Sequence, residues 1–207
     1  MAHSQSCKEC KAAIRGFLVD VFGQDEVVEQ YCLPLPSELR GYEGHRFYSA
    51  LMAIESDLKA YRGFVCFVRR PKLPPVDFFL KSVGLVVEFD EAQHFTKPRA
   101  IALKRYPETL GLGFSREQWI RLSVTLDRHD NSPPYRDEQR AWYDTLRDFA
   151  PACLNLQPIV RLYAGDAKWC KLDRGELVRA LLFHAPPLTE YLTTAGASLT
   201  QRSKPRP

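Results

Sequence analysis

Three carboxylates and a histidine stand close together at the end of an apolar stretch of the chain. Residues 84–95 read GLVVEFDEAQHF, and their polar members are Glu88, Asp90, Glu91, Gln93 and His94. Because side chains alternate along a β-strand, Glu88 and Asp90 should project from the same face. Hard divalent cations such as Mg²⁺ prefer carboxylate oxygens as ligands. The spacing therefore favours a metal site; the alternative is a polar sheet face whose carboxylates pair with arginine or lysine.

A further carboxylate belongs to the strand expected just before this one. Residues 76–82 (VDFFLKS) read as a strand, and a tight turn joins them to a second strand over 84–91. If that turn has an even number of residues, Asp77 lies directly opposite Glu88, whereas a slip of one residue sends Asp77 to the other face. Opposed carboxylates repel each other unless a cation compensates. A Mg²⁺ or Mn²⁺ ion there would activate a bound water and stabilise charge on a phosphoryl oxygen.

The remaining segments indicate a mixed α/β fold with a small sheet. Apolar positions recur at helical spacing in several of them, and Ser115 followed by Gln118 is typical of a capping box. Helices are expected over residues 6–22, 45–61, 98–106, 115–127, 136–149 and 174–184. Strands are expected over residues 64–68, 76–82, 84–91 and 158–164. The segment 136–149, RDEQRAWYDTLRDF, is interpreted as a helix that packs its apolar side chains on the core.

Length and charge set limits on the class of protein. The chain has 207 residues and a formal net charge of +4. That length suits one domain with additions, and the charge permits nucleic-acid binding without demanding it. The first residues lack the apolar centre of a signal peptide, and no apolar run approaches the roughly 18–20 residues that span a bilayer. We therefore expect a cytoplasmic protein with no membrane partner.

Cysteine spacing gives a weaker alternative. The six cysteines show no disulfide-framework spacing, although Cys7 and Cys10 form a C-x-x-C pair. A structural zinc site needs about four ligands, and no second pair of this kind follows. The favoured interpretation places both cysteines on the first helix, one turn apart. A small zinc-dependent regulator is the alternative.

The stretch from residue 76 to residue 95 resembles the PD-(D/E)XK restriction-endonuclease-like nucleases. In that pattern one strand carries an Asp and the next carries Glu-x-Lys; here PPVDFF supplies Asp77 and VVEFDEAQH supplies Glu88. Asp90 replaces the usual lysine, which is similar to the branch of very-short-patch-repair endonucleases with its E-x-D-G-x-x-H motif. His94 matches the histidine of that motif, but a glutamate stands where the branch has glycine.

The resemblance implies a restriction-endonuclease-like core of helix, three strands, helix and strand. Its first helix would be 45–61, which often adds an acidic residue, here Glu55. The implied division is an N-terminal helix and loop packed on the core (1–44), a nuclease-like core (45–165) with a helical insertion around 115–150, a C-terminal helix (166–190) and a disordered tail (191–207).

The function implied by the resemblance is that of a divalent-metal-dependent nuclease that uses Mg²⁺ or Mn²⁺. Nucleic acid is the expected partner, with DNA favoured, and a homodimer would suit an enzyme that cuts two strands. The expected catalytic residues are Asp77, Glu88, Asp90, Gln93 and His94, and the expected metal ligands are Asp77, Glu88, Asp90 and Glu55. The expected phosphate-binding residues are Lys97, Arg99, Lys104 and Arg105. Because the usual lysine is absent, the alternative is a non-catalytic scaffold that binds nucleic acid or protein.

Overall fold

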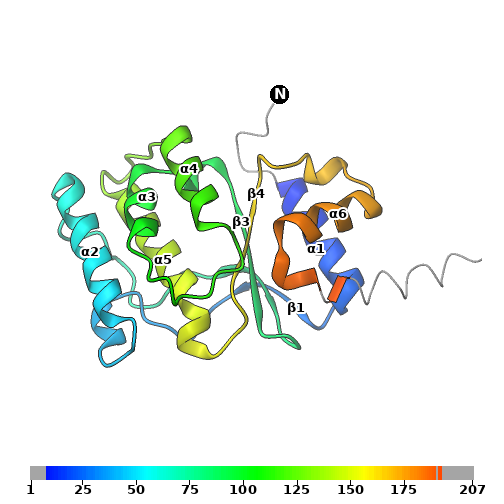
Figure 1. Cartoon of the computed structure of the whole chain (residues 1–207), viewed down its shortest axis with the longest axis horizontal. Coiled ribbons are helices and arrows are strands. Elements are labelled where there is room, and N and C mark those ends of the chain that lie inside the picture. Colours follow the sequence, from blue (N-terminus) through cyan, green and yellow to red (C-terminus); the bar gives the residue numbers. More distant parts are fainter. Residues whose placement is uncertain (1–7, 190, 193–207) are drawn as a thin grey trace, which may run out of the picture.

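A four-stranded sheet separates two layers of helices in the computed structural model, which describes residues 8–189 together with 191 and 192 (Figure 1). The strands are β1 (Val27–Tyr31), β2 (Val76–Leu80), β3 (Leu85–Asp90) and β4 (Val160–Tyr163). The helices are α1 (Lys8–Phe22), α2 (Tyr48–Arg62), α3 (Lys97–Lys104), α4 (Arg116–Leu126), α5 (Arg136–Leu154) and α6 (Arg174–His184). The mixed α/β class expected from the sequence is confirmed.

The sheet has the order β1-β2-β3-β4, with antiparallel pairs except for β3 and β4, which run parallel. In the β2–β3 hairpin Leu80 lies opposite Leu85, which is the register expected for an even turn. Gly84 closes that turn with a φ of +62°, a conformation that favours glycine. The same register continued along the strands sets Asp77 opposite Glu88.

Two expectations about the strands need correction. Residues 64–68 form no strand, because Val65 and Cys66 are exposed and only Phe67 is buried in the core. The strand before β2 is instead β1, which the sequence analysis missed because VVEQY buries only Val27. Short apolar runs are ambiguous in sequence, and a polar edge strand gives little signal. The observed order is therefore α1, β1, α2, β2, β3, α3 to α5, β4 and α6, so that α2 interrupts the expected run of three strands.

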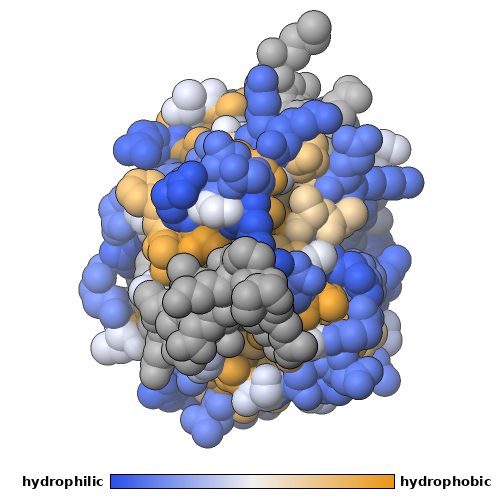
Figure 2. Space-filling view, turned by 90° about the vertical axis from the view of Figure 1, so that its right-hand side faces the viewer, coloured by the Kyte–Doolittle hydropathy of each residue, from blue (hydrophilic) through white to orange (hydrophobic). Residues whose placement is uncertain are grey.

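One face of the sheet packs against α1 and α6. The buried side chains on this side include Ile14, Leu18, Phe78, Val87, Phe89, Leu162, Trp169 and Leu181. The outer surface of this side is mostly hydrophilic, with small hydrophobic patches between the polar residues (Figure 2). Of the β3 side chains, Leu85, Val87 and Phe89 point to this face. This confirms the expected alternation, because Val86 belongs to the core on the other face.

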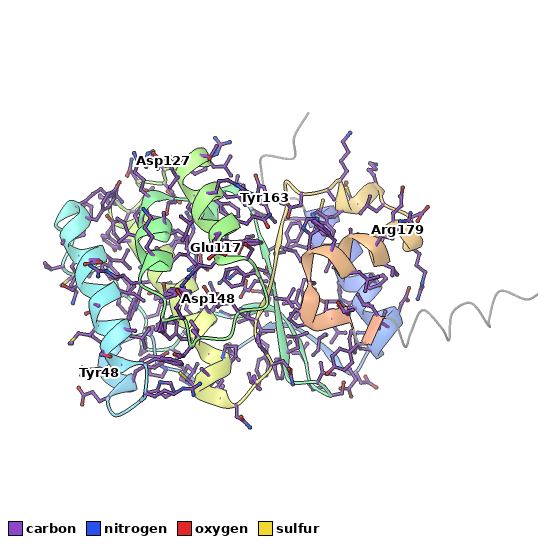
Figure 3. All side chains as sticks on the ribbon, viewed as in Figure 1. Tyr48, Glu117, Asp127, Asp148, Tyr163 and Arg179 are labelled. Atoms are coloured by element: carbon purple, nitrogen blue, oxygen red, sulfur yellow. The ribbon has the colours of Figure 1, made fainter. Side chains whose placement is uncertain are left out.

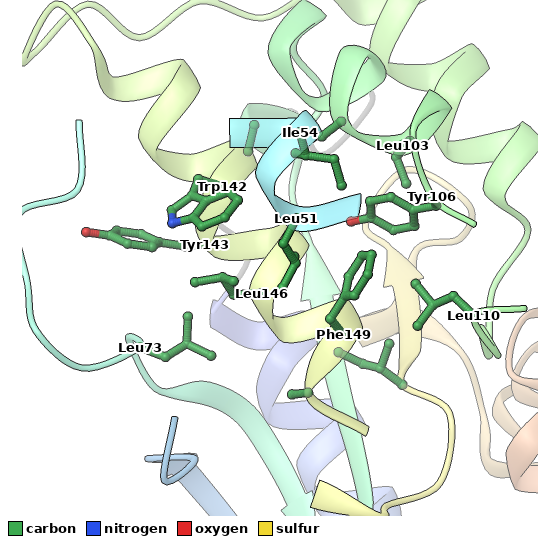
Figure 4. Packing of buried hydrophobic residues seen from close by; sticks show 14 of the residues in the cluster. Leu51, Ile54, Leu73, Leu103, Tyr106, Leu110, Trp142, Tyr143, Leu146 and Phe149 are labelled. Carbon is green, nitrogen blue, oxygen red and sulfur yellow. The ribbon is translucent and has the colours of Figure 1, made fainter. Parts of the chain in front are cut away.

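The other face of the sheet is covered by α2 to α5. Tyr48 and Asp127 mark opposite ends of this layer (Figure 3). Its core is formed by large side chains from α2, α5 and the segment after α3, including Leu51, Ile54, Tyr106, Trp142, Leu146 and Phe149 (Figure 4). The hydroxyl of Tyr143 points away from this cluster (Figure 4). Helix α5 therefore packs one side into this core, and its other side lines a cleft at the surface.

Side-chain caps fix the helix starts on this face. Thr96 accepts a hydrogen bond from the backbone N–H of Arg99 and starts α3, and Ser115 accepts one from the backbone N–H of Gln118, which is one of the two hydrogen bonds of the expected capping box. Helix α6 matches its expected bounds, whereas α5 continues five residues further than expected, to Leu154. Among the described residues, no helix combines the length and apolar character needed to cross a membrane.

Candidate functional site

Asp77 on β2 lies between the sheet and helix α1. Its Oδ2 atom accepts a hydrogen bond of 3.0 Å from the backbone N–H of Phe89 on β3, and its Oδ1 atom accepts one of 2.8 Å from Lys11 Nζ on α1. Burial opposes the charge on Lys11, but Asp77 outweighs burial and raises the pKa of the lysine. The charges of Glu88 and Glu91 also act on Lys11. A lysine absent from the strand motif is thus supplied beside the carboxylates by the first helix.

Glu88 is the most unusual carboxylate of the site. Its residue is 4% exposed, and burial raises its pKa to about 7, against which Arg147 acts in the opposite direction. Oε1 of Glu88 is 3.3 Å from Nε of Arg147, but within the described residues neither atom makes a hydrogen bond. The carboxylate therefore has an unsatisfied oxygen and can gain or lose a proton near neutral pH, which is the property expected of a catalytic or ligand-binding group.

Asp90 shares the Glu88 face, as expected, but both of its oxygens are already engaged. Oδ1 accepts a hydrogen bond of 2.7 Å from Nη1 of Arg161, and Oδ2 accepts one of 2.7 Å from Nε1 of Trp119. Burial would raise the pKa of Asp90, but Arg161 and His94 hold it below its ordinary value. Asp90 is therefore a buried partner of Arg161, and the expected role of an open metal ligand has no support in these contacts.

Arg161 on β4 is the centre of a buried charge network beneath α5. Its Nε donates to Asp148 at 2.7 Å and its Nη2 to the carbonyl of Asp144 at 3.2 Å. Asp148 belongs to the helical layer (Figure 3). It also accepts a hydrogen bond of 2.6 Å from Nη2 of Arg99. Arg99 is 1% exposed, so the expectation that it contacts phosphate is wrong. The sequence placed it on a surface, whereas α3 turns it into the core.

His94 forms a pair with Asp144 of α5 at the rim of this network. Its Nδ1 is 2.9 Å from Oδ2 of Asp144. Burial opposes protonation of the ring, but Asp144 outweighs burial and raises the pKa of His94. Burial would also raise the pKa of Asp144, yet His94 and Arg161 lower it well below its ordinary value. The imidazole therefore holds a proton more readily than a solvated histidine, and its Nε2 remains the nitrogen for chemistry outside the pair.

An arginine-lined cleft of about 480 Å³ opens next to His94. Its basic side chains are Arg69, Arg70, Arg136, Arg140 and Arg147. His94, Gln93, Gln139, two tyrosines and two prolines complete the lining, which contains no carboxylate. Arg147 connects the cleft to the buried site, because it lines the cleft and pairs with Glu88. Such a lining favours an anionic ligand.

The sequence analysis missed this cleft because it assigned α5 to the core alone. The helix repeats Arg136, Arg140, Tyr143 and Arg147 at intervals of four, three and four residues, which is the spacing of one helical face. That stripe was the available signal. Arg69 and Arg70 come from the segment between α2 and β2, whose position no local pattern reveals.

Of the other expected site residues, Gln93 lies at the cleft and the rest lie outside this arrangement. Glu55 Oε2 is 2.7 Å from Lys59 on the same helix, and α2 packs mainly on α3 and α5. Gln93 donates to Glu91 at 3.1 Å and is exposed at the cleft. At the surface Lys97 pairs with Asp127, Arg105 pairs with Asp57, and Lys104 is exposed. The structure thus brings Asp90 and His94 together beside Glu88, whereas the Asp77 carboxylate contacts Lys11 of α1 and Glu55 stays on the outer helix.

The fit of a divalent cation can be judged from these contacts. No three Asp, Glu, His or Cys side chains within the described residues are arranged to hold a metal ion. The unsatisfied Oε1 of Glu88 is nonetheless a suitable donor, since a cation would replace the proton that its raised pKa favours. Asp77, whose charge acts on Glu88, is the adjacent carboxylate. Cys10 is buried on α1, and Cys7 lies outside the described residues.

No family model, curated protein or solved structure matches this chain. The chemistry of the site follows from its own residues. A glutamate with a near-neutral pKa, a histidine–aspartate pair and an arginine-lined cleft meet on the sheet face that α5 covers.

Proposed function

We propose that the chain is a divalent-metal-dependent nuclease that hydrolyses phosphodiester bonds of nucleic acid, with DNA the favoured substrate. The observation that carries the proposal is the position of Glu88, a buried carboxylate with a pKa of about 7, next to Arg147 of a cleft lined by five arginines. The restriction-endonuclease-like core would use α1 and β1 as its first helix and strand. All residues of the site come from one chain, so a homodimer is not needed to complete it.

In the proposed hydrolysis, some residues of the site bind the substrate and others would hold the metal or transfer a proton. Arginines of the cleft bind phosphate oxygens through paired N–H donors and orient the scissile group. Glu88 and Asp77 would hold Mg²⁺ or Mn²⁺, which when bound supplies a water of lowered pKa and a counter-charge for the phosphoryl oxygens. His94, whose pKa is raised by Asp144, would give a proton to the leaving oxygen.

The first test is cleavage of linear duplex DNA, single-stranded DNA and RNA in EDTA, Mg²⁺ or Mn²⁺. We expect metal-dependent cleavage by the native chain and a loss of about a hundredfold or more in Glu88→Gln, because a ligand and its charge are removed. Glu117→Gln on the exposed side of α4 is the matched control, since its side chain is 76% exposed. Equal cleavage by Glu88→Gln, or cleavage that EDTA does not affect, would contradict the proposal.

Lys11 provides a second test of the same site. We expect Lys11→Met to cleave at least about tenfold more slowly, because the cation that stabilises charge beside Asp77 is lost. The same change should tighten Mn²⁺ binding severalfold in a calorimetric titration, because a cation that competes for Asp77 is removed. Lys8→Met, at an exposed position of the same helix, should leave both measurements unchanged. A lysine with only a structural role would not move the two readouts in opposite directions.

The second candidate function is a non-catalytic nucleic-acid-binding scaffold. It is favoured by the ion pairs that already neutralise the carboxylates: Lys11 with Asp77, Arg147 with Glu88 and Arg161 with Asp90. Under this alternative the cleft binds nucleic acid, but the chain neither binds Mn²⁺ nor cleaves any substrate. The cleavage assay and the titration therefore separate the two functions.

A further inference from the structure

The basic lining of the cleft follows helix α5 as a continuous stripe. Arg136, Arg140, Tyr143 and Arg147 occupy one face, and at about 1.5 Å of rise per residue the stripe is roughly 16 Å long. It ends at Arg147, beside Glu88. A stripe of this length can contact the phosphates that flank one or two nucleotides of an extended strand, and its direction leads the strand toward the buried glutamate.

Two further arginines of the cleft come from the segment between α2 and β2. Among the described residues no carboxylate forms an ion pair with Arg69 or Arg70. The Arg69 guanidinium lies over the Tyr135 ring, 4.8 Å from its centroid, and Nε donates to the Tyr135 hydroxyl at 3.0 Å. A guanidinium held over a ring in this way can stack a nucleobase on its outer side while it neutralises a phosphate.

The shape of the site distinguishes a single strand from a duplex. Proteins that read a duplex insert a convex helix or ribbon into a groove about 12 Å wide. Here the charged groups line a concave cleft of about 480 Å³, which is a volume typical of small-ligand sites. One or two nucleotides fit such a volume, whereas a paired strand would be held outside. Positively charged concave grooves with aromatic platforms are typical of single-strand binding.

We propose that the cleft binds a single nucleic-acid strand, with its phosphates along α5 and a base stacked on the Arg69–Tyr135 pair. The strand would enter near Arg136 and pass Arg140 toward Glu88. This inference rests on the proposed function for the direction of the strand, but binding is measured separately from cleavage.

The experiment measures fluorescence anisotropy of a short labelled DNA strand, the same sequence as a duplex, and the same sequence as RNA. It uses the full chain carrying Glu88→Gln in EDTA, so that no cleavage interferes. We expect the single strands to bind about tenfold or more tightly than the duplex. The logarithm of the affinity should fall linearly with the logarithm of salt concentration, at a slope of about −0.7 per phosphate contacted.

Variants locate the binding in the cleft. Arg69→Ala and Arg136→Ala, both at exposed positions, should each weaken single-strand binding by about fivefold or more. Arg174→Ala on α6, in the opposite helical layer, is the control and should bind as the parent does. Duplex binding as tight as single-strand binding, or no effect of Arg69→Ala and Arg136→Ala, would overturn the inference.

The two proposals can fail independently. Single-strand binding that depends on the cleft arginines, without cleavage by the native chain, overturns the nuclease and supports this inference. Metal-dependent cleavage of duplex DNA alone, without single-strand binding, supports the nuclease and overturns this inference.

Discussion

Replacement of Arg161 by Met is expected to lower the free energy of unfolding by about 3–5 kcal/mol. The arginine is fully buried and reaches Asp90 and Asp148 at 2.7 Å each. Its removal leaves Asp90 without its nearest cation and Asp148 with Arg99 alone, in a region that water does not reach. A methionine fills much of the volume, so the loss reports the unpaired charges rather than a cavity.

Urea denaturation and thermal melting measure this effect. The melting temperature should fall by about 6–20 °C, because each kcal/mol corresponds to roughly 2–4 °C for a chain of this size. Arg174→Met is the matched control, because its pair with Asp20 is 2.6 Å long but the side chains are 44% and 55% exposed. A solvent-exposed pair contributes about 1 kcal/mol or less. If Arg161→Met lowered the free energy of unfolding no more than Arg174→Met, the prediction that Arg161 stabilises the buried carboxylates would be wrong.

Glu88→Gln is expected to stabilise the fold above neutral pH, although the proposed function predicts that the same change impairs cleavage. Burial raises the pKa of Glu88 from 4.5 to about 7, so the folded chain keeps a proton that the unfolded chain releases. The stability contributed by this proton is fully present below about pH 4.5 and is lost as the pH rises to about 7. A glutamine at position 88 does not titrate, so the variant does not lose this stability as the pH rises. Above pH 7 the variant should therefore exceed the native chain by about 3 kcal/mol.

The measurement is the free energy of unfolding of both proteins across this pH range, in EDTA. Their difference should grow from near zero below about pH 4.5 and become constant above about pH 7. Contributions from titrating groups that do not interact with Glu88 are common to both proteins and cancel in the difference. Glu117→Gln should show no comparable change. A difference that did not vary with pH would contradict a raised pKa for Glu88.

The local part of the site could be predicted from sequence. Strand alternation placed Glu88 and Asp90 on one face, and turn length set Leu80 opposite Leu85, because both depend on a few consecutive residues. The partners of these groups could not be predicted. Arg161 contacts Asp90 across 71 positions of the chain and Lys11 contacts Asp77 across 66. Contacts of that kind depend on how whole elements pack, which no local spacing encodes.

The errors have the same physical origin. Arg99 follows an acidic strand and has the composition of a phosphate contact, but the rotation of α3 buries it against Asp148. Residues 64–68 have the composition of a strand, yet the sheet position before β2 belongs to β1. In both cases the residue types were compatible with the predicted role. The tertiary packing, which the local sequence does not show, gave them a different one.

The parallel pairing of β3 with β4 also has a consequence for how the chain folds. β3 is synthesised before β4, the strand that pairs with its second edge, and helices α3 to α5 lie between them in the chain. Until then one edge of β3 presents unpaired backbone groups and its carboxylates lack Arg161. Loop closure over such a distance slows folding, and an open strand edge invites pairing with other chains. We therefore expect a nascent chain that ends before β4 to be prone to aggregation, and chaperone dependence to cease once β4 is available.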